Sequence, residues 1–272
     1  MDGTRVARLA RYPVKGCAPE LLTSVHVDVD GLAHDRELAV VEGDWVLTQR
    51  EVPALARVVP GLDDATGTLG LWLREAPHAG TAAPVALAGP TRQVRLFGDP
   101  VAVVDQSEEL SGWLSEVLGR DVRLVGAPPG TRRTSPGVTE GVTVLADEGT
   151  VSLHSEASLA ALGDRVVEAG GERVPVDRFR ANVVLSGCPA HAEDEATTYA
   201  VGPVLMRFAQ QDARCAVTMV DQRTGEKDGP EPIRTLSTYR RTASGQVVFG
   251  VFAAVVTPGV VRVGDEVVLG RS

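Results

Sequence analysis

Short runs in which apolar and polar residues alternate dominate the first hundred positions of the chain. Residues 6–12 and 25–31 alternate in this way, and residues 37–41 and 45–48 flank the turn-forming triplet Glu42-Gly43-Asp44. Successive side chains of a strand point to opposite faces, so this period predicts half-buried strands, and the short glycine-containing connection predicts a hairpin. Four further runs, at 69–73, 85–87, 94–97 and 101–104, continue the series. Many short strands at close spacing predict a small barrel or sandwich.

Two stretches show the helical period instead. Ser107 is a candidate N-cap, and the apolar residues after it recur three and four positions apart until Gly119. Ser155 is a second candidate cap, and its helix is predicted to end at Gly170-Gly171. The apolar faces consist of Leu110, Trp113, Leu114, Val117 and Leu118 in the first helix and of Leu159, Leu162 and Val166 in the second.

A segment rich in proline and glycine, residues 126–137, interrupts these patterns and predicts a linker or loop. Beyond it, further strand-like runs are predicted at 143–145, 151–153, 179–185, 204–208, 216–220, 247–256, 260–263 and 267–269. The fold class expected is mainly β with some α (α+β). We expect an N-terminal β-barrel-like subdomain over residues 1–125 and a second domain with flanking helices over residues 126–272.

Composition narrows the function classes. Hydrophobic residues make up 43% and charged residues 23% of the chain, which is typical of a soluble globular protein. The net charge of −9 argues against a nucleic-acid polymer as partner, because such binding needs clustered cations. No apolar run approaches the roughly 20 residues that span a bilayer, and the N-terminus lacks a signal-peptide pattern. We therefore expect a cytoplasmic protein without a membrane partner, whose oligomeric state the sequence leaves unknown.

The three cysteines, Cys17, Cys188 and Cys215, lie far apart. They have no zinc-type spacing and are too few for the four thiolates of an ordinary iron–sulfur cluster. Cys215 is the chief candidate for chemistry, because Arg214 precedes it and a neighbouring guanidinium favours the thiolate. A cysteine in an apolar run also occurs simply as a small buried side chain, and the run itself leaves both interpretations open.

Several separate motifs point to a known family when they are taken in order. They are Tyr12-Pro13-Val14-Lys15-Gly16-Cys17, Asp35-Arg36, Thr48-Gln49-Arg50, Ser155-Glu156-Ala157-Ser158, Phe179-Arg180-Ala181-Asn182 and Arg214-Cys215. Together they resemble the MOSC family of molybdenum-cofactor proteins. Within it the chain looks most like the group that contains the mitochondrial amidoxime-reducing components and bacterial enzymes that reduce N-hydroxylated bases.

The resemblance implies a MOSC β-barrel domain after the N-terminal barrel, and one molybdenum cofactor, a pterin with a phosphate. It implies that Cys215 is the metal's protein ligand and the catalytic residue, since a soft thiolate suits this metal. It also implies that Lys15, Arg36 and Arg180 neutralise the cofactor's phosphate and acidic pterin, with Gly16 beside them.

Other positions carry two interpretations. Ser155 matches a serine that lies against the cofactor in the family, and its helix start would direct free N–H groups toward a phosphate, but it also fits a plain N-cap. Asn182 either bonds the pterin or fastens a loop. Arg50 and Thr48 either line the cleft or end a strand. His154 is a candidate proton donor. Gly16 and Ala213 replace a serine and a polar residue that are common in the reductase group.

Three functions remain. The first is an oxidoreductase that reduces hydroxylamines, amidoximes or N-hydroxylated bases with electrons from a separate ferredoxin-like or flavin protein. The second is a molybdenum-cofactor carrier or a sulfur-handling module in which Cys215 carries persulfide. The third is a pterin-binding protein without turnover.

Overall fold

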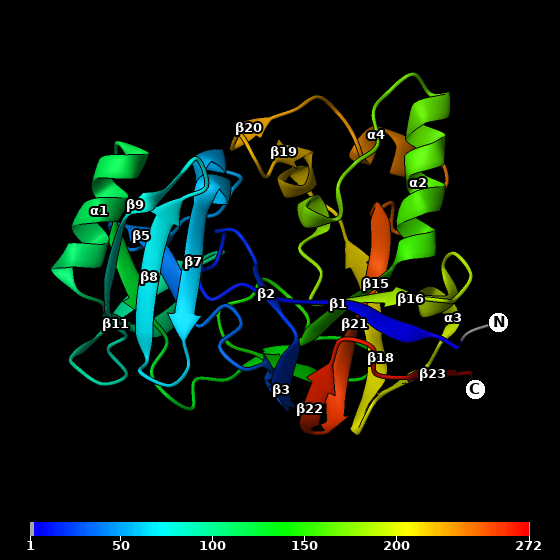
Figure 1. Ribbon diagram of the computed structural model, residues 1–272, viewed down its shortest axis with the longest axis horizontal. Helices are drawn as coiled ribbons and strands as arrows, with labels where there is room; N and C mark the ends of the chain where they lie inside the picture. The colour runs from blue at the N-terminus through cyan, green and yellow to red at the C-terminus, as the bar shows by residue number, and fades with distance from the viewer. Residues whose placement is uncertain (1–2, 272) are drawn as a thin grey trace.

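The chain folds into two lobes that lie side by side (Figure 1), and the computed structural model describes residues 3–271. The first lobe contains a closed barrel. Its strands are, in order, β10 (Thr91–Leu96), β11 (Asp99–Asp105), β12 (Arg123–Gly126), β5 (Leu38–Glu42) and β6 (Trp45–Val46). Val94 and Leu96 of β10 are buried while Arg95 between them is exposed, as the period of two predicts.

A three-stranded antiparallel sheet covers this barrel together with a helix. The sheet contains β7 (Val58–Asp63), β8 (Thr68–Leu73) and β9 (Ala76–Pro84). The helix α1 (Glu108–Leu118) is capped by Ser107, which accepts a hydrogen bond from the Leu110 amide, and ends at the left-handed Gly119. Its buried Leu110 and Leu114 pack in the core formed with this sheet, so the sequence prediction for this helix is confirmed.

An eight-stranded sheet forms the second lobe. Its order is β2 (Glu20–Leu22), β1 (Arg5–Arg11), β16 (Val183–Ser186), β15 (Val151–Ser155), β21 (Val248–Thr257), β18 (Val204–Ala213), β17 (Thr198–Val201) and β23 (Val267–Gly270). Helix α2 (Glu156–Glu168) contacts β15 and β16, with the short α3 (Ala192–Glu195) and α4 (Ile233–Leu236) nearby (Figure 1). The class is therefore mainly β with some α, as predicted.

Strands from both sides of the predicted domain boundary, between residues 125 and 126, pair with one another. Strand β1 comes from the first segment but lies beside β16, and β3 (Ser24–Asp28) pairs with both β4 (Gly31–Leu32) and β22 (Gly259–Arg262). Strands β1 and β3 thus belong to the second lobe, although they precede the barrel strands in the chain. This route places the loop after β1 between the two lobes.

Three local predictions are wrong. Residues Ala216–Met219 form a 3₁₀ helix and not a strand, because the chain turns at the end of β18. Only Val220 of the predicted run is in a strand, the short β19 (Val220–Asp221), which β20 (Glu226–Lys227) follows. Residues 85–87 are irregular, and the strand precedes them as β9, whose small and polar side chains hid it. The supposed linker contains β13 (Arg133–Ser135), which pairs with β14 (Gly141–Thr143).

The remaining short helices are of the 3₁₀ type, at Pro53–Arg57 and Val176–Phe179. In the part of the chain that the structure describes, no helix is both long and apolar enough to cross a membrane.

Candidate functional site

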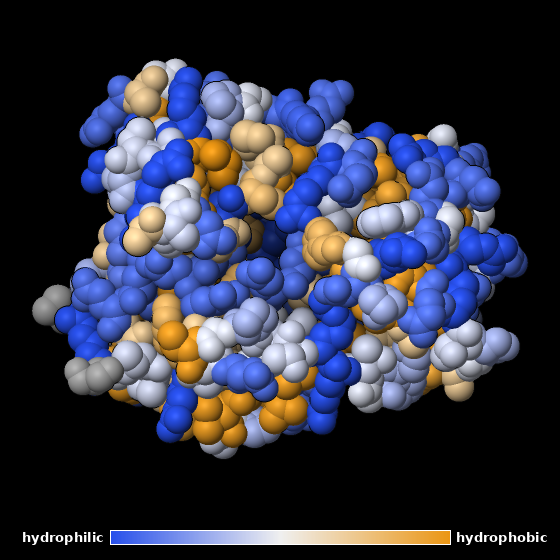
Figure 2. Space-filling model, turned by 180° about the vertical axis from the view of Figure 1, so that it is seen from behind, coloured by the Kyte–Doolittle hydropathy of each residue, from blue (hydrophilic) through white to orange (hydrophobic). Residues whose placement is uncertain are grey.

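A cavity of about 710 Å³ lies where the loop after β1, the barrel and the end of β18 meet. Figure 2 shows a hollow near the centre of one face, with hydrophilic residues around it. The charged residues that line the cavity are Lys15, Arg36, Arg50, Arg133, Arg178, Arg180 and Arg214, together with Asp99, Asp147, Glu148 and Asp212. Seven cations thus face four acids in a protein whose net charge is −9. The wall is suited to an anion.

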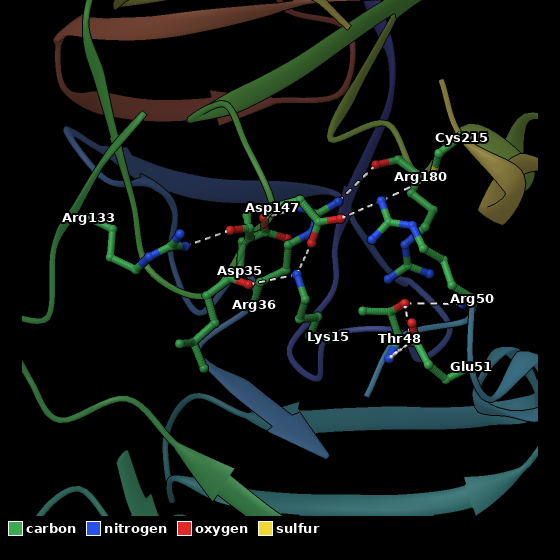
Figure 3. Close-up of polar contacts among 12 residues, drawn as sticks. Lys15, Asp35, Arg36, Thr48, Arg50, Glu51, Arg133, Asp147, Arg180 and Cys215 are labelled. Atoms are coloured by element: carbon green, nitrogen blue, oxygen red, sulfur yellow. Dashed lines mark hydrogen bonds and ion pairs between the residues drawn. The ribbon is translucent and has the colours of Figure 1, made fainter. Parts of the chain in front are cut away.

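Lys15 lies at the bottom of this wall, 4% exposed. Its ammonium donates to the Leu145 carbonyl at 2.9 Å and forms an ion pair with Asp147. Burial lowers the pKa of Lys15, and the Asp147 carboxylate opposes that effect. Asp147 also lies 3.4 Å from Arg50, so one carboxylate stands between two cations (Figure 3). The sequence did not point to Asp147, because this residue belongs to a loop without a recognisable pattern.

Gly16 follows Lys15 in a conformation that only glycine adopts readily, with φ of +83°. A Cβ at this position would lie 3.0 Å from Leu55 Cδ1. The Gly16 carbonyl accepts a hydrogen bond of 2.7 Å from the side-chain amide of Gln49, which in turn exchanges two bonds with Gln222. The loop that presents Lys15 is therefore fastened to both lobes.

Arg36 and Arg180 come from distant parts of the chain and meet over one aromatic ring. Their guanidinium carbons lie 4.5 and 4.2 Å from the centroid of Tyr12. Arg36 donates to the Arg180 carbonyl at 3.1 Å, and Arg180 donates to the Cys17 carbonyl at 2.7 Å. Both have positive φ, 54° and 55°, a conformation that costs free energy in residues other than glycine. The fold thus holds two like charges together at the cavity.

Asn182 lines the cavity, but its side chain forms hydrogen bonds with backbone groups. Its Oδ1 accepts from the Ser152 amide at 3.2 Å and its Nδ2 donates to the Ala10 carbonyl at 3.2 Å. These bonds join β1 to β15 beside the site. Of the two interpretations of Asn182, this geometry supports the fastening role.

Ser155 is the predicted site residue that the structure does not bring to the cavity. Ser155 is fully buried and does not line the cavity. Its hydroxyl caps α2 by accepting a hydrogen bond of 3.1 Å from the Ser158 amide. Glu193 accepts from both the Ser155 amide and the Ser158 hydroxyl, at 3.2 and 2.6 Å. A buried carboxylate therefore occupies the start of this helix, where the sequence analysis expected a phosphate.

Cys215 is partly exposed at the cavity, two residues after the end of β18. The neighbouring cation is not the one that the sequence suggested. Arg214 points away and bonds the carbonyls of Phe249 and Phe179, both at 2.9 Å, as well as Asp212. Arg50 instead reaches Cys215, with its Nη2 3.3 Å from the sulfur (Figure 3). Side chains of adjacent residues on extended backbone point to opposite sides, which explains why Arg50 and not Arg214 contacts the Cys215 sulfur.

Thr48 accounts for how Arg50 reaches the sulfur. The Thr48 hydroxyl accepts from the Arg50 amide at 3.1 Å and donates to Glu51 at 2.7 Å, which closes a turn. Arg50 then extends from this turn across the ring of Phe97, 4.9 Å from its centroid. Both residues line the cavity, as the first of their two interpretations expected.

His154 is not placed to donate protons. It is fully buried behind Arg214, whose Nη2 lies 3.0 Å from the His154 Nε2, and it does not line the cavity. Burial and the Arg214 charge lower the pKa of His154 well below its usual value, so the ring stays neutral. Asp212, which forms an ion pair with the same Arg214, does line the cavity. Burial raises the pKa of Asp212 to about 7 against the opposing effect of Arg214.

The residues fit the anionic cofactor that the resemblance implies. The Arg180 Nη2 is buried and has no hydrogen-bond partner among residues 3–271, so a donor stands ready at the cavity. No group of three or more His, Cys, Asp or Glu side chains within the described residues could hold a metal by itself. Cys215 would therefore be a single protein ligand to a metal that the cofactor also binds.

Comparison with known proteins identifies two family domains in the chain. The MOSC N-terminal beta barrel domain matches residues 3–121, and the MOSC domain matches residues 140–268. Mitochondrial amidoxime-reducing component 1 of Mus musculus is 32% identical over 97% of this chain and 82% of its own length. The human protein of the same name is 29% identical with the same coverage. Molybdenum cofactor sulfurase of Danio rerio is 32% identical over 89% of this chain, which spans 31% of that relative.

Proposed function

The chain belongs to the MOSC family, and from this premise we propose that it is a molybdenum-cofactor-dependent oxidoreductase that reduces N-hydroxylated compounds. The proposal rests on one observation: the partly exposed thiol of Cys215 lies in a cavity whose wall contains seven cations and four acids. A pterin phosphate needs the cations, and the metal needs the thiolate. The match to the amidoxime-reducing component of Mus musculus covers 82% of that relative's length, which favours its reaction class for this chain.

Each residue of the wall takes a definite part. Cys215 would hold the metal, and Lys15, Arg36 and Arg180 would bind the phosphate and the acidic pterin through charge-assisted hydrogen bonds. When bound, the cofactor supplies a metal that exchanges electrons and accepts oxygen. Arg50 would remain beside the Cys215 sulfur, where its charge faces the atom that would hold the metal.

The reaction needs protons as well as electrons. An amidoxime takes up two electrons and two protons, its N–O bond breaks, and an amidine and water leave. Asp212 lines the cavity three residues before Cys215, and burial raises its pKa to about 7, so its carboxyl group can hold and donate one of the protons near neutral pH. The amidine is a strong base and becomes a cation.

Electrons would come from a separate ferredoxin-like or flavin protein. The three cysteines of this chain lie in three separate connecting segments, and the described residues contain no group of His, Cys, Asp or Glu side chains that could hold a metal cluster. The identity of this donor and the expected cytoplasmic location stay predictions.

Metal analysis and turnover together test the proposal. Protein purified from a host that makes the cofactor should contain about one molybdenum per chain and should reduce benzamidoxime with reduced methyl viologen as electron donor. Protein from a host that cannot make the cofactor should lack both the metal and the activity. Zinc or no metal at full cofactor supply would contradict the proposal.

A second candidate is a sulfur-handling module, because molybdenum cofactor sulfurases share the matched region. In that case Cys215 would carry a persulfide. Treatment with cyanide should then release one thiocyanate per chain, a product that a cysteine bound to the metal does not yield.

A further inference from the structure

The tip of the hairpin between β10 and β11 is unusual. Leu96 pairs with Asp99, so Phe97 and Gly98 form the two central residues of the turn, with φ of 54° and 98°. Two-residue turns with both angles positive favour Asn-Gly or Asp-Gly, and a bulky aromatic residue in the first position carries a conformational cost. The turn alone would be formed better by asparagine. Something other than the hairpin must therefore account for the aromatic side chain.

The position of the Phe97 ring supplies the reason. Phe97 is 51% exposed, yet it lines the cavity, and two of the cavity's cations lie over its ring. The Lys15 ammonium lies 5.4 Å and the Arg50 guanidinium 4.9 Å from its centroid. Arg50 in turn contacts the Cys215 sulfur. Phe97 and Cys215 thus line the same cavity, with the Arg50 guanidinium between them.

The other phenylalanines of the wall are less accessible. Phe179 is 2% exposed. Phe252 is only partly exposed, because its ring packs against Gly149 so closely that a Cβ on Gly149 would clash with it. Among the lining phenylalanines that the structure describes, Phe97 therefore offers a ligand the largest free face. In a wall otherwise made mainly of charged and polar groups, such a face binds a flat unsaturated ring better than a puckered saturated one.

We propose that Phe97 is a substrate-contacting residue that selects N-hydroxylated substrates in which the reducible group is carried on a flat, unsaturated ring. This inference rests on the proposed function, because it assigns a substrate preference to that same site. The hairpin retains phenylalanine against its turn preference because the ring stacks on the substrate's ring while the N–OH group points toward Cys215. The Lys15 and Arg50 charges lie beside the ring and hold it in place.

The test uses two substrates with the same reducible group and different rings, benzamidoxime and cyclohexanecarboxamidoxime. With reduced methyl viologen as donor, the ratio of their kcat/KM values should favour benzamidoxime in the wild type. Phe97→Leu should reduce this ratio about 3- to 10-fold, the usual worth of an aromatic pair. Its molybdenum content should stay at the wild-type level. An unchanged ratio in Phe97→Leu would overturn the proposal.

Trp45→Leu is the matched control. Trp45 belongs to the same barrel, is 52% exposed and lies 5.8 Å below an arginine, Arg95, but it does not line the cavity. Its substitution should leave the ratio unchanged. A fall equal to that of Phe97→Leu would mean that loss of any barrel aromatic distorts the site, and it would overturn the assignment to Phe97.

A binding measurement separates this inference from the proposed function. Benzamidoxime should bind the oxidised, molybdenum-loaded protein without electron donor, and calorimetry should show about 3- to 10-fold weaker binding to Phe97→Leu, with little change for the cyclohexane compound. If the wild type reduces neither amidoxime, the proposed function fails, and this measurement still decides the role of Phe97. Equal affinities of wild type and Phe97→Leu for benzamidoxime would overturn it.

Phe97→Asn tests the conflict between turn and site. Asparagine adopts the left-handed conformation more readily, so the variant should unfold at a higher temperature than the wild type and should lose the preference for benzamidoxime. A variant that unfolds at a lower temperature and keeps the preference would make Phe97 a structural residue, which would overturn the proposal.

Discussion

Arg50 lies 3.3 Å from the sulfur of Cys215, although 165 positions separate the two residues. The same guanidinium approaches Asp147, and its contacts with the Cys215 sulfur and Asp147 raise the pKa of Arg50 even though burial works against its charge. A permanent cation is therefore in direct contact with the sulfur that is the candidate nucleophile and metal ligand. This pair joins the barrel lobe to the end of β18, so the reactive sulfur depends on both lobes.

Replacement of Arg50 should therefore slow the chemistry of the free thiol. In the cofactor-free protein we expect Arg50→Gln to lower the rate at which iodoacetamide alkylates Cys215, by about tenfold, because the neighbouring charge is lost. Peptide mass spectrometry after timed alkylation measures this rate. Arg57→Gln removes the same charge from a pair with Glu75 outside the cavity and serves as control. Equal rates in Arg50→Gln and the wild type would show that Arg50 does not affect the thiol.

Cys215→Ser should separate cofactor binding from turnover. Serine stays protonated near neutral pH and is a poor ligand for this metal, so reduction of amidoximes should collapse. The pterin should remain at a sizeable fraction of the wild-type level, because Lys15, Arg36 and Arg180 hold it by charge. Pterin fluorescence after oxidation and turnover with an artificial donor measure the two quantities. A variant that keeps near-normal molybdenum-dependent reduction would refute the role of Cys215.

Lys15→Met should weaken cofactor binding. The lost charge-assisted hydrogen bond is worth about 1.5–3 kcal/mol, or roughly 10- to 150-fold in affinity. The variant also leaves Asp147 without its Lys15 partner, next to the bound phosphate. We therefore expect the double variant Lys15→Met, Asp147→Asn to regain part of the loss. Pterin content per folded chain, with folding checked by circular dichroism, is the measurement. Loss of folded protein in place of cofactor would identify a purely structural ion pair.

Asp212 should give the reaction its dependence on pH. A carboxyl group that donates a proton must be protonated, and burial raises the pKa of Asp212 to about 7. The value of kcat should therefore be high below pH 7 and fall as the pH rises through about 7. Asp212→Asn should lower kcat by about 100-fold or more, the usual worth of a general acid, and remove this decline. A variant whose kcat shows the same decline would transfer the role to another group.

The sequence alone determined the class and the chemistry-bearing residue types. The 3.6-residue period with Ser107 and Gly119 defined α1, because capping and burial of one helix face are local properties. Lys15, Gly16, Arg36, Arg180 and Cys215 were identified by ordered motifs, and all of them line one cavity. Such motifs are legible because each needs a particular residue type at a particular backbone position, as the positive φ of Gly16 illustrates.

Only the tertiary structure decided which charge meets which partner. Arg214 precedes Cys215 in sequence but turns to Asp212, whereas Arg50 crosses from the barrel to the sulfur. Ser155 matched a family motif, yet Glu193 from a distant segment fills the space at its helix start. Nothing in the sequence assigned Asp147 or Phe97 to the site, and the predicted strand 94–97 included Phe97, which the structure places in the turn. Contacts between lobes depend on side-chain direction and on how strands from both ends of the chain pair, and neither follows from a local pattern.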